Sequence, residues 1–205
     1  ALEHGLRQAL RWRAAGFAWR LNLNVGAASL QQPGYARRVA AALDAAGWLA
    51  ADLELDFTEA ALQADPETAQ AQLQALHQLG VRILLDDCGR GDASLGLLRR
   101  FPFAAVKLDR DLVVALGRGA GPDAGMAAAL TTAAHSLGLA VYAEGVEAEN
   151  QRAPLAALGC SAWQGFLHCR PLDVASLLAR APHPSGRASA PARASPGDRA
   201  MIARR

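Results

Sequence analysis

The sequence predicts an α/β protein whose strands run parallel and are covered by helices. Segments with strand and helix patterns alternate about six times along the 205 residues, which is typical of a parallel sheet. Polar residues gather where the expected strands end, and in a barrel of parallel strands these ends open on one face. A doubly wound sheet also binds ligands at strand ends, but no Gly-x-Gly-x-x-Gly segment follows the first expected strand. We therefore favour an incomplete TIM-like (β/α) barrel with about six of its eight strands present.

In the N-terminal half, apolar residues at helical spacing alternate with short apolar runs. The expected helices cover 2–15, 35–46 and 66–79. They stop at Gly16, Gly47 and Gly80. Pro66 suits the first turn of the third helix. The expected strands cover 17–25, 53–57 and 83–85.

The C-terminal half continues the alternation. The expected strands cover 104–108, 139–143 and 162–166. The expected helices cover 94–99, 124–137, 151–158 and a last segment that Asp173 caps and that ends at 181. The glycine-rich segment 117–125 is expected to be a loop. Residues 1–181 thus form one barrel domain, and residues 182–205, rich in Pro, Ser, Ala and Arg, form a disordered basic tail.

The most informative stretch is the double acid that follows the strand at 83–85. Asp86 and Asp87 stand side by side, and Gly89 and Gly91 then force a turn. Neighbouring residues of a strand point to opposite faces, so both acids can serve one site only where the strand stops. Two adjacent anions repel and need a cation, most simply a divalent metal. Read alone, the segment could equally be an Asp- and Gly-rich turn.

Lysine usage points to a second special position. Of 21 basic residues, 20 are arginine, and the one lysine, Lys107, lies inside an expected strand two residues before Asp109. Lysine and arginine are not interchangeable where a compact ammonium must fit. Chance at a single position is the alternative explanation.

Composition limits the class of protein. With 52% hydrophobic and 20% charged residues the chain is globular, and no apolar run is long enough to cross a membrane. The three cysteines lack Cys-x-x-Cys spacing, so we expect a reduced, cytoplasmic setting. The net charge is only +2, with five arginines after residue 181, so we expect no binding of a nucleic-acid polymer by the body of the chain.

Several separated motifs resemble the EAL domain family, whose members hydrolyse cyclic di-GMP. The resemblance extends from about Trp12 to Leu172. The matching segments are Leu23-Asn24-Val25, Asp56-Phe57-Thr58-Glu59, Asp86-Asp87-Cys88-Gly89, Lys107-Leu108-Asp109, Ala143-Glu144-Gly145-Val146-Glu147 with Gln151, and Gln164-Gly165-Phe166 with Pro171.

This resemblance implies a two-metal phosphodiesterase that uses Mg²⁺ or Mn²⁺ and yields linear pGpG. One metal would be held by Asn24, Asp56 and Asp86, and the second by Asp86, Asp87 and Glu144. Lys107 would act in catalysis together with Asp87 and Glu144, by orienting the water and offsetting negative charge. Substrate-binding or loop-anchoring roles would fall to Glu59, Asp109, Glu147 and Gln164. Taken singly, Asn24, Asp56 and Glu59 could instead be turn or cap residues.

Some family features are changed. The Glu-Ala-Leu segment of the family, which supplies one metal ligand, is not in this sequence, so we expect the first strands to be missing and the first metal site to be impaired. Position 56 carries Asp where the family has Glu, and Cys88, Arg90 and Asp92 replace Phe, Thr and Tyr. The alternative is therefore a catalytically inactive module that binds cyclic di-GMP or a protein partner as a regulator. A homodimer or an attached sensor or GGDEF domain is also possible.

Overall fold

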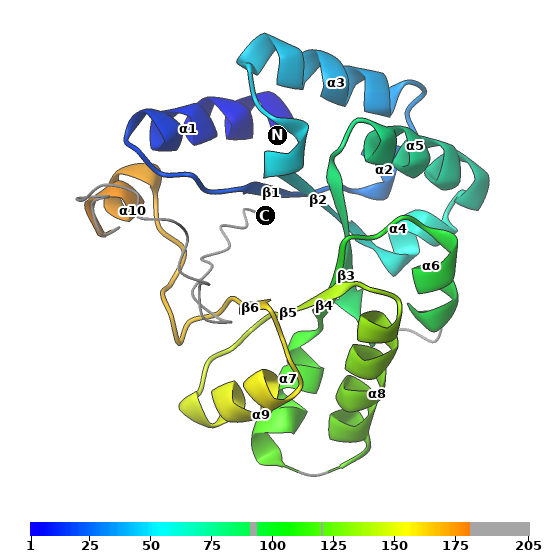
Figure 1. The fold of residues 1–205 in the computed structure, drawn as a ribbon, viewed down its shortest axis with the longest axis vertical. Helices are drawn as coiled ribbons and strands as arrows, with labels where there is room; N and C mark the ends of the chain where they lie inside the picture. Colours follow the sequence, from blue (N-terminus) through cyan, green and yellow to red (C-terminus); the bar gives the residue numbers. More distant parts are fainter. Residues whose placement is uncertain (91–93, 120, 181–205) are drawn as a thin grey trace.

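The computed structural model describes residues 1–90, 94–119 and 121–180 of the chain. Six parallel strands form one sheet in the order of the sequence, which makes the first and last strands its edges. The strands are β1 (Leu21–Asn24), β2 (Leu53–Thr58), β3 (Arg82–Cys88), β4 (Ala105–Leu108), β5 (Ala140–Ala143) and β6 (Ala162–Trp163). Figure 1 shows the sheet curving into a partial barrel, with β1 and β6 at the two ends of the curve. The predicted fold class is confirmed.

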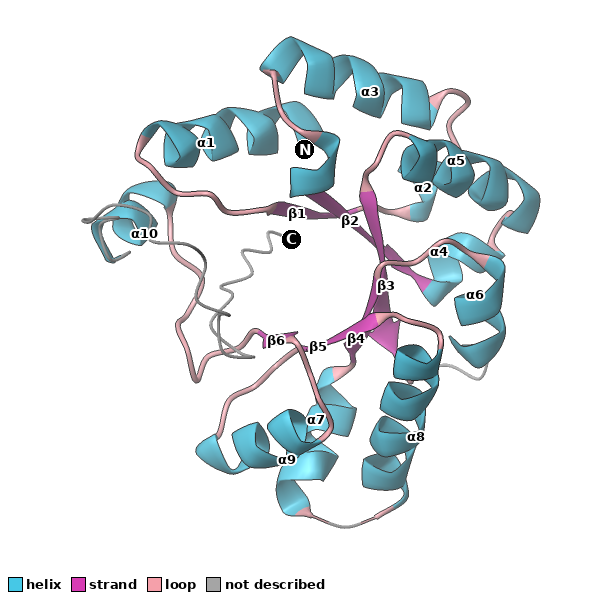
Figure 2. Ribbon diagram, in the orientation of Figure 1, coloured by secondary structure: helices cyan, strands magenta, loops and turns pink. Residues whose placement is uncertain are grey.

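Helices cover the convex side of the sheet (Figure 2). The helices of the described chain are α1 (Leu2–Ala14), α2 (Ala27–Leu30), α3 (Tyr35–Ala46), α4 (Glu59–Gln63), α5 (Pro66–Gln78), α6 (Ser94–Arg100), α7 (Arg110–Arg118), α8 (Pro122–Ser136), α9 (Arg152–Ala157) and α10 (Val174–Arg180). The last of them, α10, lies beside α1 at the open side of the curved sheet (Figure 2). Two 3₁₀ turns, Ala50–Asp52 and Glu149–Gln151, precede β2 and α9. None of the described helices combines the length and apolar character that crossing a bilayer requires.

The two faces of the sheet carry different side chains, because successive residues of a strand point to opposite sides. The outer face and the helices share the main apolar core, to which the strands contribute Leu23, Leu55, Phe57, Ile83, Leu85, Val106, Leu108 and Val141. The inner face has a small apolar cluster of its own, made of Leu84, Ala105, Tyr142 and Ala162. The rest of the inner face is polar, so polar and charged side chains line the lumen of the partial barrel.

Most expected elements are present, and the differences have local causes. Of the strand expected over 17–25, only Leu21–Asn24 pairs with a neighbour. No element was expected for 109–116, yet α7 begins at Arg110 because the Asp109 side chain accepts a hydrogen bond from the Asp111 N–H at 2.8 Å. The tail expected to be disordered, 182–205, and the substituted position Asp92 lie outside the described residues.

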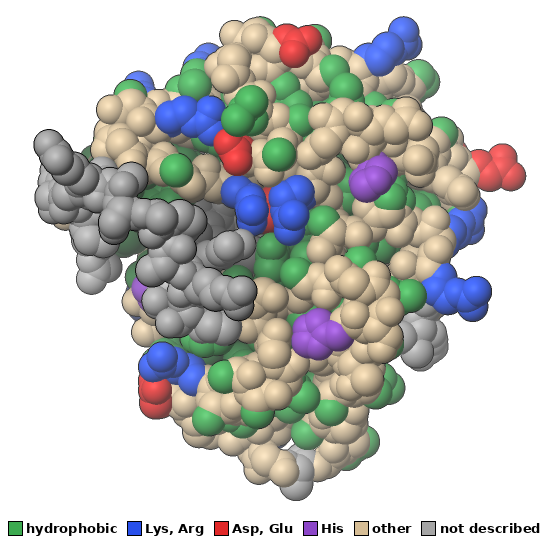
Figure 3. All heavy atoms as spheres, in the orientation of Figure 1, with side chains coloured by type: hydrophobic (Ala, Val, Ile, Leu, Met, Phe, Trp, Pro, Cys, Tyr) green, Lys and Arg blue, Asp and Glu red, His purple; other side chains and the backbone are tan. Residues whose placement is uncertain are grey.

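On the side of the molecule drawn in Figure 3, charged side chains are scattered. Basic side chains lie there singly or in small groups, separated by uncharged and apolar surface.

Candidate metal and catalytic site

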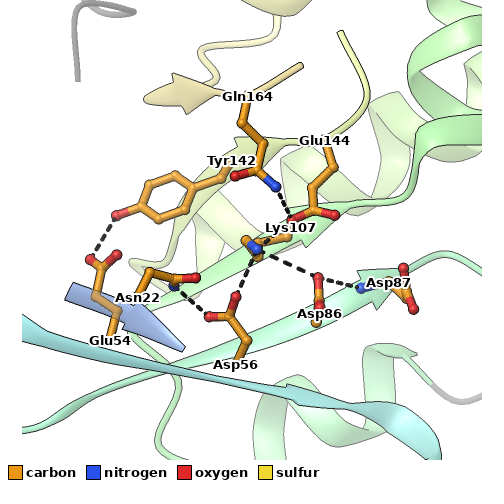
Figure 4. A network of polar contacts seen from close by, with 9 residues as sticks. All are labelled: Asn22, Glu54, Asp56, Asp86, Asp87, Lys107, Tyr142, Glu144 and Gln164. Carbon is orange, nitrogen blue, oxygen red and sulfur yellow. Dashed lines mark hydrogen bonds and ion pairs between the residues drawn. The ribbon is translucent and has the colours of Figure 1, made fainter. Parts of the chain in front are cut away.

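Polar side chains converge at the C-terminal ends of the strands, on the inner face. On each of five strands, or directly after it, one of these polar residues follows another inner-face residue by two positions. The earlier residue of each pair lies deeper in the lumen. The pairs are Glu54 and Asp56, Leu84 and Asp86, Ala105 and Lys107, Tyr142 and Glu144, and Ala162 and Gln164. Figure 4 shows the outer member of each pair pointing toward a common centre. The strand period of two therefore brings residues together that are up to about a hundred positions apart in sequence.

Lys107 is the centre of this cluster. Its side chain is 1% exposed, and its Nζ lies 2.7 Å from Asp56 Oδ2 and 3.7 Å from Asp86 Oδ1, and also contacts Glu144 Oε1. Burial alone would lower the pKa of Lys107, but the carboxylates of Asp56, Glu144 and Asp86 raise it above its usual value. The lysine is thus a permanent cation inside the barrel.

Asp56 is held from two sides. Its Oδ1 accepts a hydrogen bond from Asn22 Nδ2 at 2.7 Å, and its Oδ2 accepts one from Lys107 Nζ at 2.7 Å. Burial nevertheless raises the pKa of Asp56 to about 6, with Lys107 and Asn22 opposing this rise and Asp86 adding to it. Ionised Asp56 is therefore a costly group in the folded protein.

The double acid serves one site because the strand is irregular there. The pairing of β3 with β4 shifts register between Leu85 and Cys88, and Asp87 has a φ of 53°, in the left-handed region. Oxygens of Asp86, Asp87 and Glu144 consequently lie within 4.8 Å of one another. Burial raises the pKa of Asp87, and the neighbouring Asp86 raises it further. The expectation that both acids share one site is met by a bulge before the strand ends.

Glu144 is fixed by its own loop and by the next strand. Gln164 Nε2 donates a hydrogen bond to Glu144 Oε1 at 2.8 Å. The buried Gln151 side chain accepts hydrogen bonds from the N–H groups of Glu147 and Ala148, at 2.7 and 2.9 Å. Burial raises the pKa of Glu144, partly countered by Lys107. These contacts hold the carboxylate against the lysine.

The loop that follows β6 packs closely on the loop that follows β5. A Cβ atom on Gly165 would lie 2.1 Å from the backbone oxygen of Val146, so only glycine fits. The N–H of Val146 donates to the Gln164 carbonyl at 3.0 Å, and the N–H of Leu167 donates to the Val146 carbonyl at 3.0 Å. The two loops therefore move together, with Gln164 and Glu144 on them.

Of the two asparagines of β1, Asn22 is the one that contacts Asp56. It is buried and donates a hydrogen bond to Asp56 Oδ1. Asn24, the predicted metal ligand, is exposed at the end of β1 and pairs in register with Asp56, and its side chain makes no hydrogen bond to any described residue. Residues two apart in a strand share a face, so both asparagines lie on the side of the predicted site, and the role of Asn24 as a metal ligand stays a prediction.

Three other expected residues lie around the cluster. Glu59 is buried at the start of α4, whose N-cap is Thr58. Asp109 caps α7, and its Oδ2 lies 4.0 Å from Arg90 Nη1. Glu147 forms an exposed ion pair with Arg110 at 2.9 Å. None of these three carboxylates belongs to the group of acids whose oxygens converge within 4.8 Å, as far as the described residues show.

The donor set fits divalent metal ions. It consists of carboxylate and amide oxygens, which are the ligands that Mg²⁺, Mn²⁺ and Ca²⁺ prefer. Asn22 Oδ1 is buried and accepts no hydrogen bond from any described residue, which is costly unless another group binds there. Close placement of Asp86, Asp87 and Glu144 likewise calls for more positive charge than one lysine supplies.

Below this cluster lies a second polar group that the motifs did not single out. Glu54 Oε1 lies 2.9 Å from Arg82 Nε and 3.5 Å from Arg20 Nη1, and it accepts a hydrogen bond from the Tyr142 hydroxyl at 3.5 Å. Arg82 Nη2 donates to the Tyr142 hydroxyl at 3.3 Å. The sequence contained a signal for this group, because Glu54 precedes Asp56 by two positions and Tyr142 precedes Glu144 by two positions.

Comparison with known proteins agrees with this geometry. The family model described as "EAL domain" matches residues 1–171. The chain belongs to the EAL domain family. This EAL chain is 38% identical over 158 residues to the cyclic di-GMP phosphodiesterase NbdA of Pseudomonas aeruginosa, covering 77% of the chain and 20% of NbdA. It is 34% identical over 179 residues to the bifunctional diguanylate cyclase/cyclic di-GMP phosphodiesterase MucR of the same organism, covering 87% and 26%.

Solved structures show the same fold. The MucR phosphodiesterase in complex with c-di-GMP superimposes with a TM-score of 0.80 at 33% identity, over 86% of this chain and 71% of that one. Klebsiella pneumoniae BlrP1 has been solved with cy-diGMP and calcium (TM-score 0.72, 28% identity, 81% and 42% covered) and with manganese (0.73, 27%, 80% and 42%). The chain spans only a fifth to about a quarter of the two curated relatives.

Proposed function

We propose that this EAL domain is a metal-dependent phosphodiesterase that hydrolyses cyclic di-GMP to linear pGpG. The observation that carries the proposal is the convergence of Asp56, Asp86, Asp87 and Glu144 around the buried ammonium of Lys107. The relatives named as cyclic di-GMP phosphodiesterases support the substrate.

Two groups of ligands follow from the geometry. Asn24, Asp56 and Asp86 would hold one ion, with Asn22 orienting Asp56 through its hydrogen bond, and Asp86, Asp87 and Glu144 would hold the second. Mg²⁺ or Mn²⁺ bound by these residues would polarise a phosphoryl oxygen and lower the pKa of a bound water. Manganese in BlrP1 supports this choice of metal.

The side chains of the chain supply the remaining functions. Lys107 places a fixed positive charge beside the acids, where it would offset the negative charge that develops as water bonds to phosphorus and the ribose 3′-oxygen leaves. Asp87 and Glu144, whose pKa values burial raises, would accept a proton from that water. Gln164 would orient Glu144 or contact the water, since it donates to Glu144 Oε1.

The surrounding acids would anchor loops. Asp109 fixes the start of α7 next to the double acid, and Glu147 ties the loop after β5 to Arg110 on α7. Glu59, buried at the start of α4, would hold the loop after β3.

A direct assay tests the proposed function. Cyclic di-GMP is incubated with the protein and Mn²⁺, and the nucleotides are separated by chromatography; pGpG should accumulate. Asp86→Asn, which removes an acid shared by both ligand groups, should abolish turnover, whereas Asp44→Asn on the exposed face of α3 should not. Absence of pGpG with the unaltered protein after hours at micromolar concentration rejects the proposal.

A second candidate is a module that binds cyclic di-GMP or a protein partner without hydrolysis. The observation in its favour is that both carboxylate oxygens of Asp56 already accept hydrogen bonds, from Asn22 and Lys107, so its capacity for a metal is reduced. Calorimetry with cyclic di-GMP and Ca²⁺ separates the two, because binding heat without any pGpG in Mn²⁺ supports the module. If neither heat nor pGpG is seen, only the version with a protein partner is left.

The setting of the domain is also a proposal. The name of MucR joins this activity to a diguanylate cyclase, so an attached GGDEF or sensor domain, or a homodimer, is expected to regulate the site. Three cysteines without disulfides agree with a cytoplasmic location.

A further inference from the structure

Tyr142 makes a contact across the lumen of the partial barrel. It projects inward from β5, and its hydroxyl lies 3.5 Å from Glu54 Oε1 of β2 (Figure 4). The same hydroxyl accepts a hydrogen bond from Arg82 Nη2 of β3 at 3.3 Å. Glu54 and Arg82 are paired neighbours on their own strands and form an ion pair of 2.9 Å. The tyrosine thus reaches a charged pair on the opposite wall, with residues 60 and 88 positions away in sequence.

Backbone pairing does not provide this connection. In the described sheet β5 pairs with β4 and β6, and β4 lies between β5 and β3. Tyr142 pairs in register with Lys107 of β4. Its ring packs with Leu84, Ala162 and Ala105, the inner residue of β4 two positions before Lys107, whose small side chain leaves room for the ring. The ring therefore packs over β4, and its hydroxyl ties the two walls together.

These walls carry the acids of the proposed site. Asp56 follows Glu54 by two residues on β2, and Glu144 follows Tyr142 by two residues at the end of β5. The distance between them depends on how strongly the sheet curves, because Lys107 on the intervening β4 must contact both carboxylates. In a closed barrel the ring of strands fixes the curvature. Within the described sheet, the contacts of Tyr142 with Arg82 and Glu54 add a tie between its walls that the backbone ladder does not provide.

We propose that Tyr142 is a positioning residue whose hydroxyl, through Arg82 and Glu54, sets the curvature that holds Glu144 and Asp56 at the spacing needed for metal binding. This proposal rests on the proposed function only in so far as the acids bind a divalent ion. Removing the hydroxyl leaves the ring in its apolar cluster and the Glu54–Arg82 ion pair intact, but releases β5 from the opposite wall. Metal binding then has to bring β5 back into position, and the free energy that this requires lowers the affinity for the ion.

Lys107 offers a specific probe, since it is the only lysine of the sequence. In protein labelled with ¹³C-lysine, the NMR spectrum contains a single lysine Cε resonance, which reports on the surroundings of Lys107. It can be measured in the metal-free and the metal-bound protein and does not depend on turnover. Titration of this resonance with Mg²⁺ gives the dissociation constant. For Tyr142→Phe we expect a shifted resonance in the metal-free protein and a dissociation constant raised about tenfold, the lower end of what supporting residues of metal sites contribute.

Controls separate positioning from general loss of structure. Tyr35→Phe removes the hydroxyl of the other tyrosine, on α3 outside the lumen, and should leave the lysine resonance and the dissociation constant unchanged. Arg82→Lys, which keeps the ion pair with Glu54 but lacks the second nitrogen that reaches Tyr142, should reproduce Tyr142→Phe. In cyclic di-GMP hydrolysis, excess Mg²⁺ should restore kcat of Tyr142→Phe, with KM for the nucleotide unchanged within about twofold.

The outcomes are distinguishable. If the unaltered protein binds Mg²⁺ and Tyr142→Phe binds it equally well with an unshifted lysine resonance, the positioning role is overturned while the proposed function stands. If Tyr142→Phe is impaired but excess Mg²⁺ does not restore kcat, the role through metal placement is likewise overturned. If the unaltered protein binds no divalent ion, the proposed function fails, whatever the variants do.

Discussion

Replacing Asp56 by asparagine should stabilise the metal-free protein at neutral pH, although it removes one partner of a buried ion pair. Burial raises the pKa of Asp56 from 3.8 to about 6. At about 1.4 kcal/mol per pKa unit, the ionised carboxylate at pH 7 destabilises the fold by about 3 kcal/mol relative to its neutral form. Lys107 keeps Glu144 and Asp86 as partners in the variant, so no uncompensated cation is left. Of the three carboxylates that contact Lys107 in the wild type, two remain.

The sign of the pH dependence follows from the same shift. Because the pKa is higher in the folded protein than in the unfolded chain, the folded protein holds the proton more tightly between pH 3.8 and about 6. This contribution to stability is fully present below that window and is lost as the pH rises through it. Asparagine does not titrate, so the difference in stability between variant and wild type should be small near pH 4 and reach its full value above pH 6.

Thermal and urea unfolding followed by circular dichroism, with a chelator present, measure this difference. For a domain of this size, about 3 kcal/mol corresponds to a Tm higher by about 6–12 °C at pH 7. The exposed Asp44→Asn serves as control and should match the wild type. Saturating Mg²⁺ should reverse the order, because the metal stabilises the wild type more than the variant. An Asp56→Asn protein less stable than wild type at pH 7 without metal would show that the pairing with Lys107 outweighs burial, and would refute the reasoning.

Three further substitutions test other parts of the site. Lys107→Met should abolish pGpG formation and lower the free energy of unfolding by about 3–5 kcal/mol, since it leaves buried acids without their cation; unchanged turnover by chromatography would contradict this. Gly165→Ala should cost about 1–3 kcal/mol or more in urea unfolding, because its Cβ would collide with the Val146 backbone, and an unaltered midpoint would mean the loops can separate freely. Gln151→Leu should cost about 1–3 kcal/mol and speed hydrogen exchange of the Glu147 N–H, which would otherwise stay protected.

Much of the site could be predicted because its residues carry strong local signals. The double acid at 86–87 stands out between an apolar strand and two glycines, and Lys107 stands out as the single lysine of the sequence. Both belong to motifs at strand ends, and a parallel sheet brings strand ends together regardless of sequence separation. The structure places both in one cluster.

Other contacts of the site depend on how neighbouring strands pack and on which side chains meet across the lumen. Asn22 and Asn24 share a face of β1, and only the tilt of neighbouring strands decides which one meets Asp56. Tyr142 reads in sequence as an ordinary strand residue, because nothing local tells that its ring crosses over Ala105 to the far wall. Tertiary packing determines these contacts, and the two-residue period of a strand does not predict them.

The left-handed backbone at Asp87 has a consequence for how such a protein can change over generations. Besides glycine, asparagine and aspartate are the residues that adopt this conformation most readily. A single-base change in an aspartate codon gives asparagine, which preserves the bulge and the placement of Asp86 while deleting one charge. The same turn can therefore persist in descendants of this protein with one carboxylate fewer beside Asp86 and Glu144.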